Sequence, residues 1–227
     1  MEYQSSPIKW CEGIYQYSDY IAEFWNTVTS MSFSLFAIYG YYIHSKYKFG
    51  NMHVSKNLWF LSGLIGPTSM IFHATLSFFG QFIDEVSVMV YLLYCMKIIH
   101  KNTNFEYFVY TTLSVLITWF MPYISPFILI TLGYFLADST RNILSYCNDS
   151  KHLWNRGYLF GLISVALWIM DWVCIINTHS WWHITITLCI YNYNLVMIKE
   201  LTYGSKGADN IKIIYSKIPY LIEEEKN

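Results

Sequence analysis

The strongest candidates for chemistry in this chain are two histidines, His179 and His183, at the start of a long apolar stretch. Residues four positions apart lie on one face of a helix, so both imidazoles would point to the same place. Two polar rings in an apolar segment are costly unless a partner satisfies them. A Zn²⁺ ion held with a third histidine from another helix would do so, and would leave one coordination position open, as in catalytic zinc sites.

Composition indicates what kind of protein must position these rings. Charged residues make up 13% of the 227 residues, whereas 55% are hydrophobic and 20% are aromatic. An average soluble domain has about 25% charged residues, so the composition favours a membrane protein with several spans. The net charge of -1 argues against nucleic acid as a partner, because such a partner would require a basic face.

Hydropathy predicts an all-α fold, an integral membrane bundle of seven transmembrane helices. Apolar segments of about 15–23 residues count as candidate spans, and they lie at 24–44, 57–78, 82–100, 106–121, 124–139, 157–177 and 181–200. Pro122 and Pro126 separate the fourth from the fifth, because proline cannot continue a helical hydrogen-bond ladder. The chain then divides into an N-terminal segment (1–23), a seven-helix domain (24–200) and a tail (201–227).

The distribution of basic residues predicts the orientation of this bundle. With seven spans, every Lys and Arg except Lys9 falls on the side of the tail. By the positive-inside rule, the N-terminus is non-cytoplasmic and the C-terminal tail is cytoplasmic. The sequon that begins at Asn148 falls on the cytoplasmic side, so glycosylation at Asn148 would contradict this topology.

The predicted topology brings a third histidine to the level of the first two. His73 lies near the non-cytoplasmic end of the second predicted helix, and His179 and His183 open the seventh at the same depth. Asp84 begins the third helix there, and Ser69 lies one turn before His73 on the same face. Five polar groups from distant parts of the sequence at one depth predict a shared metal site.

Two other interpretations of the histidines remain open from the residues alone. Intramembrane histidines are often hydrogen-bonded packing residues, and paired histidines on facing helices can bind haem iron. Two histidines on one helical turn suit a tetrahedral metal better than axial ligation of haem.

Several strings of the chain resemble the successive motifs of the alkaline ceramidases. That family consists of seven-helix zinc amidases within a hydrolase superfamily that includes the adiponectin receptors. The strings occur in order over residues 9–200, and they are Trp10-Cys11-Glu12, Tyr20-Ile21-Ala22-Glu23-Phe24-Trp25-Asn26-Thr27, Ser69-x-x-x-His73, Asp84-Glu85 and His179-x-Trp-Trp-His183.

The resemblance implies a function and a role for each site residue. The three ligands of Zn²⁺ would be His73, His179 and His183. Asp84 would hydrogen-bond a water on the metal, and Ser69 would lie beside it. Zinc lowers the pKa of such a water toward about 7, and the resulting hydroxide would hydrolyse the amide bond of a ceramide from the bilayer to a sphingoid base and a fatty acid.

The resemblance also suggests an endoplasmic reticulum or Golgi membrane as the location. Two alternatives to a ceramidase stay open. One is a seven-helix lipid-binding receptor of the same superfamily, and the other is a hydrolase that acts on another lipid.

The sequence departs from the family at a second metal site. In the mammalian-type pattern, an Asp before the Trp-Cys-Glu string and an Asn two positions after its Glu help to bind Ca²⁺, together with residues that remain here as Trp10, Glu12 and Glu23. Lys9 and Ile14 occupy those two positions, so calcium binding is expected to be weak. One hypothesis places the Lys9 ammonium between Glu12 and Glu23 in place of calcium; the alternative is a solvated Lys9.

Three residues near the non-cytoplasmic face have predicted structural roles. Cys11 and Cys174 are the pair placed to form a disulfide in an oxidising lumen. Asp171, at the level of the site, could orient a ligand histidine, bond a helix-end amide or face water.

Overall fold

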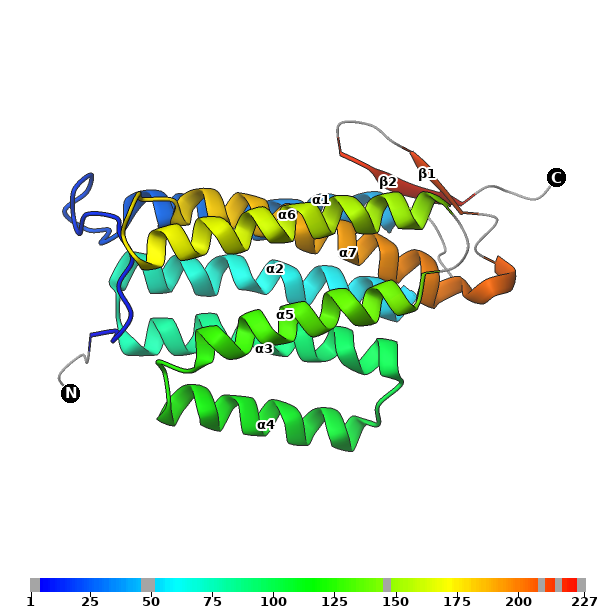
Figure 1. Cartoon of the computed structure of the whole chain (residues 1–227), viewed down its shortest axis with the longest axis horizontal. Helices are drawn as coiled ribbons and strands as arrows, with labels where there is room; N and C mark the ends of the chain where they lie inside the picture. The colour runs from blue at the N-terminus through cyan, green and yellow to red at the C-terminus, as the bar shows by residue number, and fades with distance from the viewer. Residues whose placement is uncertain (1–4, 46–51, 145–147, 208–210, 215–217, 224–227) are drawn as a thin grey trace.

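Seven helices and a short hairpin make up the part of the chain that the computed structural model describes, residues 5–45, 52–144, 148–207, 211–214 and 218–223. The helices run up and down in one bundle, so the N-terminal segment and the hairpin lie at opposite ends of it (Figure 1). The helices are α1 (Phe24–His44), α2 (Met52–Thr75), α3 (Phe78–His100), α4 (Asn104–Phe120), α5 (Ser125–Asn142), α6 (Asn148–Trp172) and α7 (His179–Gly207). The predictions of an all-α class and of seven helices are confirmed.

Local sequence signals explain several of the helix ends. The Ser77 side chain accepts a hydrogen bond from the Gly80 N–H and caps α3. Thr103 and Glu106 form a reciprocal capping box at the start of α4. Pro126 stands in the first turn of α5, where its missing N–H has no helical partner to lose.

Small residues let α1 and α2 approach closely. A Cβ atom on Gly66 would lie 2.2 Å from the Ser34 Oγ, and one on Gly40 would lie 2.7 Å from the Trp59 ring. Only glycine fits where a neighbouring helix comes this close. The tight pair matters for the site because Glu23 and His73 lie at one end of it, on α1 and α2.

The buried core lies between α1, α2, α3 and α7, whereas α4 stands at the edge of the bundle. Leu58, Tyr91, Cys95 and Leu195 are fully buried in this core. Helix α4 packs mainly against α3 and lies outermost in Figure 1. Its other faces leave large apolar side chains exposed, among them Phe105, Phe108, Leu113, Leu116 and Phe120.

One helical stretch in the described residues, Ser150–Trp172, is long and apolar enough to cross a membrane by length and hydropathy. The remaining helices are rich in Tyr, Trp, Ser and Thr, or are short, as is α4 with 17 residues. Large apolar side chains are nevertheless exposed on the outer faces of α1, α2, α4 and α5.

The region predicted as a tail contains ordered structure that the sequence did not reveal. Helix α7 continues to Gly207, and an antiparallel hairpin follows, formed by β1 (Ile211–Ile214) and β2 (Tyr220–Glu223). Leu221 of β2 is fully buried, and its N–H donates to the His44 Nε2 at 3.2 Å. The Tyr191 hydroxyl donates to the Pro219 carbonyl at 2.8 Å. The hairpin is therefore docked on α1 and α7.

Candidate metal centre

Three buried histidines from two helices meet at the end of the bundle that carries the N-terminal segment. His73 lies in the last turn of α2, and His179 and His183 occupy the first turns of α7. One ring nitrogen from each lies within 4.8 Å of the others. The three side chains are at most 2% exposed. The convergence that the sequence predicted for these three residues is present in the fold.

Hydrogen bonds on two of the rings leave a bare nitrogen for a metal. The His73 Nδ1 lies 2.6 Å from the Glu23 Oε2, and the carboxylate can only accept, so Nδ1 carries the proton. The His183 Nδ1 lies 2.9 Å from the Thr29 Oγ1, whose own proton goes to the Trp25 carbonyl, so this Nδ1 also donates. In both rings Nε2 then has a free lone pair, the arrangement that a metal ligand requires.

Two nitrogens of this cluster have no protein partner. The His179 Nδ1 and the His183 Nε2 are buried without a hydrogen bond within the described part of the chain. A buried polar atom without a partner costs about 1–3 kcal/mol. A metal ion bound between the three rings would remove that penalty, so the residues present fit a metal with three nitrogen ligands.

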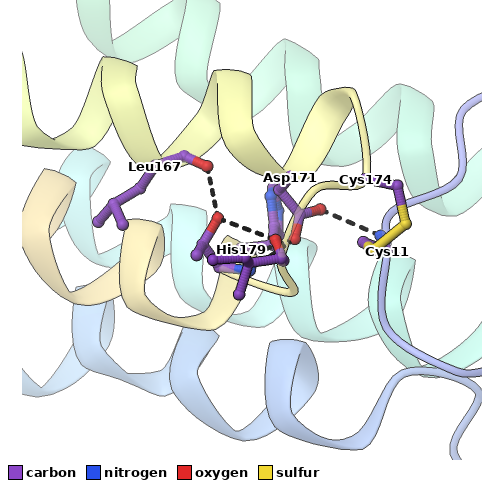
Figure 2. Close-up of a disulfide and its surroundings, with 7 residues drawn as sticks. Cys11, Leu167, Asp171, Cys174 and His179 are labelled. Carbon is purple, nitrogen blue, oxygen red and sulfur yellow. Dashed lines mark hydrogen bonds between the residues drawn. A yellow bond between two sulfur atoms is a disulfide. The ribbon is translucent and has the colours of Figure 1, made fainter.

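Asp171 fixes the backbone where α7 begins. Its Oδ1 accepts hydrogen bonds from the N–H groups of Thr178 (2.7 Å) and His179 (3.1 Å), and its Oδ2 accepts one from the Cys11 N–H (3.1 Å; Figure 2). Of the three predicted alternatives, bonding to helix-end amides is the one observed, and Asp171 is buried from solvent. Asp171 therefore sets the position of His179 through the main chain.

A disulfide and an aromatic stack close the site from outside. The predicted bridge between Cys11 and Cys174 is present, with the two Cα atoms 5.1 Å apart (Figure 2). It holds Trp10 against the metal centre, where the indole stacks on the His179 ring at 3.7 Å between centroids. Trp10 also contacts Trp168 and Trp172 edge to face. The sequence did not predict this cover, because the contact depends on how the N-terminal segment folds back.

The fold brings Ser69 of α2 and Asp84 of α3 together. Ser69 is buried one turn before His73 on α2, and its hydroxyl is a hydrogen-bond partner of the Asp84 carboxylate on α3. The Ser69 Oγ also lies 3.0 Å from the Ser30 Oγ. The structure thus pairs the two residues predicted to be catalytic.

Glu23, directly before α1, and two residues of α1 support the site in ways that sequence reasoning missed; Glu23 was predicted only for the calcium site. Glu23 holds His73, Thr29 holds His183 and Ser30 contacts Ser69. Glu23, Asn26 and Ser30 recur at helical spacing and are all buried. A polar stripe of this kind on an otherwise apolar helix is the signal that could have identified them.

The calcium-site residues have other partners in this fold. Both carboxylate oxygens of Glu12 accept backbone hydrogen bonds, from the N–H groups of Trp25 (2.7 Å) and Asn26 (2.9 Å). Burial raises the pKa of the Glu12 carboxyl above its ordinary value, although these two N–H donors oppose the shift. The Glu23 Oε2 is shared by the His73 ring and the Asn26 Nδ2.

The hypothesis that Lys9 replaces calcium is wrong. Lys9 is exposed, and none of the ion pairs among the described residues joins it to Glu12 or Glu23. Ile14 is also exposed and has no oxygen to offer. Ca²⁺ takes about 6–8 oxygen ligands, and these side chains provide too few, so the residues present do not fit a strong calcium site.

Glu85, the neighbour of Asp84, is buried but points to a separate network. It accepts hydrogen bonds from the Ser125 hydroxyl and from the Gln81 Nε2, the latter at 2.9 Å. These contacts tie α3 to the start of α5 and keep Glu85 away from the histidines.

The fold and the site define a helical protein with a buried three-histidine centre at one end of its bundle. The sequence model of the ceramidase family matches residues 2–222. The chain therefore belongs to the ceramidase family, and it is a hydrolase of that class.

Individual relatives agree with this assignment at modest identity. Human alkaline ceramidase 1 is 26% identical over 94% of this chain and 89% of its own length. The alkaline ceramidase of Drosophila melanogaster is 28% identical over 82% of this chain and 74% of its own length. A Saccharomyces cerevisiae alkaline ceramidase is 40% identical over a shorter region, 39% of this chain and 27% of its own length.

Proposed function

We propose that this protein is a zinc-dependent intramembrane amidase that hydrolyses the amide bond of ceramides to a sphingoid base and a free fatty acid. The observation that carries the proposal is the buried trio of His73, His179 and His183, in which the His179 Nδ1 and the His183 Nε2 have no hydrogen-bond partner among the described residues. Family membership supports the ceramide substrate. The donor set supports zinc, which favours imidazole ligands in tetrahedral sites with one open position.

The residues beside the histidines are suited to amide hydrolysis. When bound, Zn²⁺ would supply an activated water at neutral pH and polarise the amide carbonyl. The Asp84 carboxylate would take the proton of that water and deliver it to the leaving amine nitrogen. The Ser69 hydroxyl would donate a hydrogen bond to the carbonyl oxygen as negative charge develops there.

The outer surface of the bundle supports a location inside a membrane. Large apolar side chains are exposed on most helices, and α4 shows them along its length. Soluble monomers rarely expose contiguous apolar patches of more than a few hundred Å², so lipid is the environment that suits these faces. We place the histidine end on the non-cytoplasmic side, because the basic residues gather at the other end, and we propose the endoplasmic reticulum or Golgi as the membrane.

Metal analysis and ceramide turnover on purified variants test the proposal together. The wild type is expected to carry zinc and to release fatty acid from ceramide. His179→Ala is expected to lose both the zinc and the turnover, because one of three ligands is gone. Asp84→Asn is expected to keep the zinc and lose about 10²–10⁴-fold in turnover, the contribution of a positioned acid-base group.

Three results would contradict this function. Zinc binding without turnover of any lipid would make the protein a receptor. Faster cleavage of another lipid class across a substrate panel would change the substrate. Iron with a Soret absorption band would identify a haem site.

A further inference from the structure

A second site lies at the end of the bundle opposite the histidines, where α3 meets α4 and α5. A cavity of about 230 Å³ opens there. Its walls are almost entirely apolar: Leu93, Met96, Tyr107 and Leu132 line it together with Lys97 and His100, whose polar atoms contribute little of the surface. Neither Asp84 nor any of the three clustered histidines takes part, so this cavity is separate from the metal centre.

Lys97 brings a positive charge to the cavity, and no carboxylate in the described part of the chain forms an ion pair with it. Its Nζ lies 2.5 Å from the Asn104 Oδ1, a neutral acceptor, and 5.1 Å from the centre of the Tyr107 ring. Lys101, the next lysine along the chain, follows α3 directly as its C-cap residue. An uncompensated cation above apolar walls is complementary to a molecule with an anionic head and a hydrocarbon chain.

We infer that this cavity binds an anionic glycerophospholipid, with its net negative head group at the Lys97 ammonium and one acyl chain along Leu93, Met96 and Leu132. Pockets that enclose a small molecule measure about 300–1,000 Å³, so this smaller cavity encloses only part of the lipid and the rest stays in the bilayer. The inference rests on the membrane location proposed above, but not on the hydrolysis of ceramide. In the proposed orientation this end is cytoplasmic, where anionic lipids concentrate and basic pockets between helices bind their head groups.

Lipid retention by the purified full chain tests this site. The protein is mixed with dioleoylphosphatidylserine or dioleoylphosphatidylcholine in detergent, and bound lipid is measured by native mass spectrometry together with the melting temperature. Phosphatidylserine is expected to be retained and to raise the melting temperature, whereas phosphatidylcholine is not. Loss of one lysine contact corresponds to about fivefold weaker binding, which is the effect expected for Lys97→Gln.

Matched variants distinguish lipid binding in this cavity from a general attraction of anionic lipid to positive charge on the protein. Lys97→Arg keeps the charge and is expected to retain phosphatidylserine. Lys151→Gln removes a charge from the exposed start of α6, at the same end but outside the cavity, and is expected to bind as the wild type does. Leu132→Trp is expected to fill the cavity and reduce retention while every charge remains, which keeps the proposal testable if Lys97→Gln fails to fold.

Several outcomes would overturn the proposal. They are equal retention of both lipids, unchanged phosphatidylserine binding in Lys97→Gln or Leu132→Trp, or tighter binding of free oleate than of phosphatidylserine at this site. Zinc content and ceramide turnover are measured on the same samples, so a failure here is distinguishable from a failure of the proposed amidase.

Discussion

Each imidazole of the candidate metal centre is positioned by a different kind of neighbour. Glu23 accepts from His73, Thr29 accepts from His183, and the Trp10 ring covers His179. Such neighbours fix the tautomer and the orientation of a ligand, and their loss commonly weakens metal affinity or activity by about 10–100-fold.

Thr29→Val tests this support at the level of one hydroxyl. Valine keeps the shape of threonine but cannot accept from the His183 Nδ1, so the ring loses the contact that holds its tautomer. We expect zinc affinity to fall by about tenfold, measured by competition with a chelator. Thr131→Val is the control, because Thr131 is exposed and its hydroxyl donates to the Phe127 carbonyl of its own helix. Equal affinities for both variants would show that the Thr29 contact does not support the ligand.

The sequence predicted the chemical residues better than their supports. Three histidines with an aspartate and a serine could be placed at one depth because helical spacing and span order determine depth. Thr29 and Trp10 could not be assigned, since their roles depend on which neighbouring segment packs against α7. The proposed substitute for calcium failed for a similar reason, because the Glu12 carboxylate turns to the backbone of α1.

At the scale of elements, the N-terminus of α1 is capped by a side chain of the N-terminal segment rather than by the residue that precedes the helix. The residue before the helix, Glu23, makes no side-chain cap, and Glu12 instead accepts from two N–H groups of the first turn. Those N–H groups have no partner within a helix, and a negative charge next to them is favourable.

Glu12→Ala is therefore expected to destabilise the fold by about 1–2 kcal/mol, the effect of losing a helix cap. Glu12→Gln keeps an acceptor oxygen without the charge, and is expected to fall between alanine and the wild type. Denaturation of the purified protein measures both. Asp19→Ala, an exposed carboxylate of the same segment, is expected to leave stability unchanged, and an equal loss in that control would contradict the capping role.

Helix bounds followed the hydropathy pattern only where apolar residues reach the ends of the element. The prediction for α1, residues 24–44, matches the structure. Helix α6 was predicted at 157–177 but spans Asn148–Trp172, because its first turns are polar and were excluded by hydropathy. The apolar residues after Trp172 leave the helix at Cys174, which has a φ of 50° in the left-handed region.

At the scale of the whole molecule, two clamps hold the ends of the bundle. At one end, Cys11–Cys174 and the Asp171 contacts tie the N-terminal segment to the turn between α6 and α7. At the other, the hairpin packs on α1 and α7 through Leu221. Hydropathy could not predict the hairpin, because its strands are four residues long and owe their order to contacts with the helices.

Removing the disulfide is expected to loosen both the fold and the metal centre. Cys11→Ser should lower stability by about 2–4 kcal/mol and increase the rate at which a chelator removes zinc, since Trp10 is no longer held over His179. Cys174→Ser and the double variant should each lose as much stability, and release zinc as fast, as Cys11→Ser does. All three variants lack the same disulfide bond. Additive losses in the double variant, measured by thermal unfolding and zinc release, would show that the two cysteines act separately.

The disulfide also sets an order of events during synthesis of the chain. Cys174 is added 163 residues after Cys11, so the disulfide cannot tether the N-terminal segment until α6 has been synthesised. Trp10 can reach its place only once α7 has followed and presented His179. The three clustered histidines can therefore come together only late in synthesis, after the first six helices have been made.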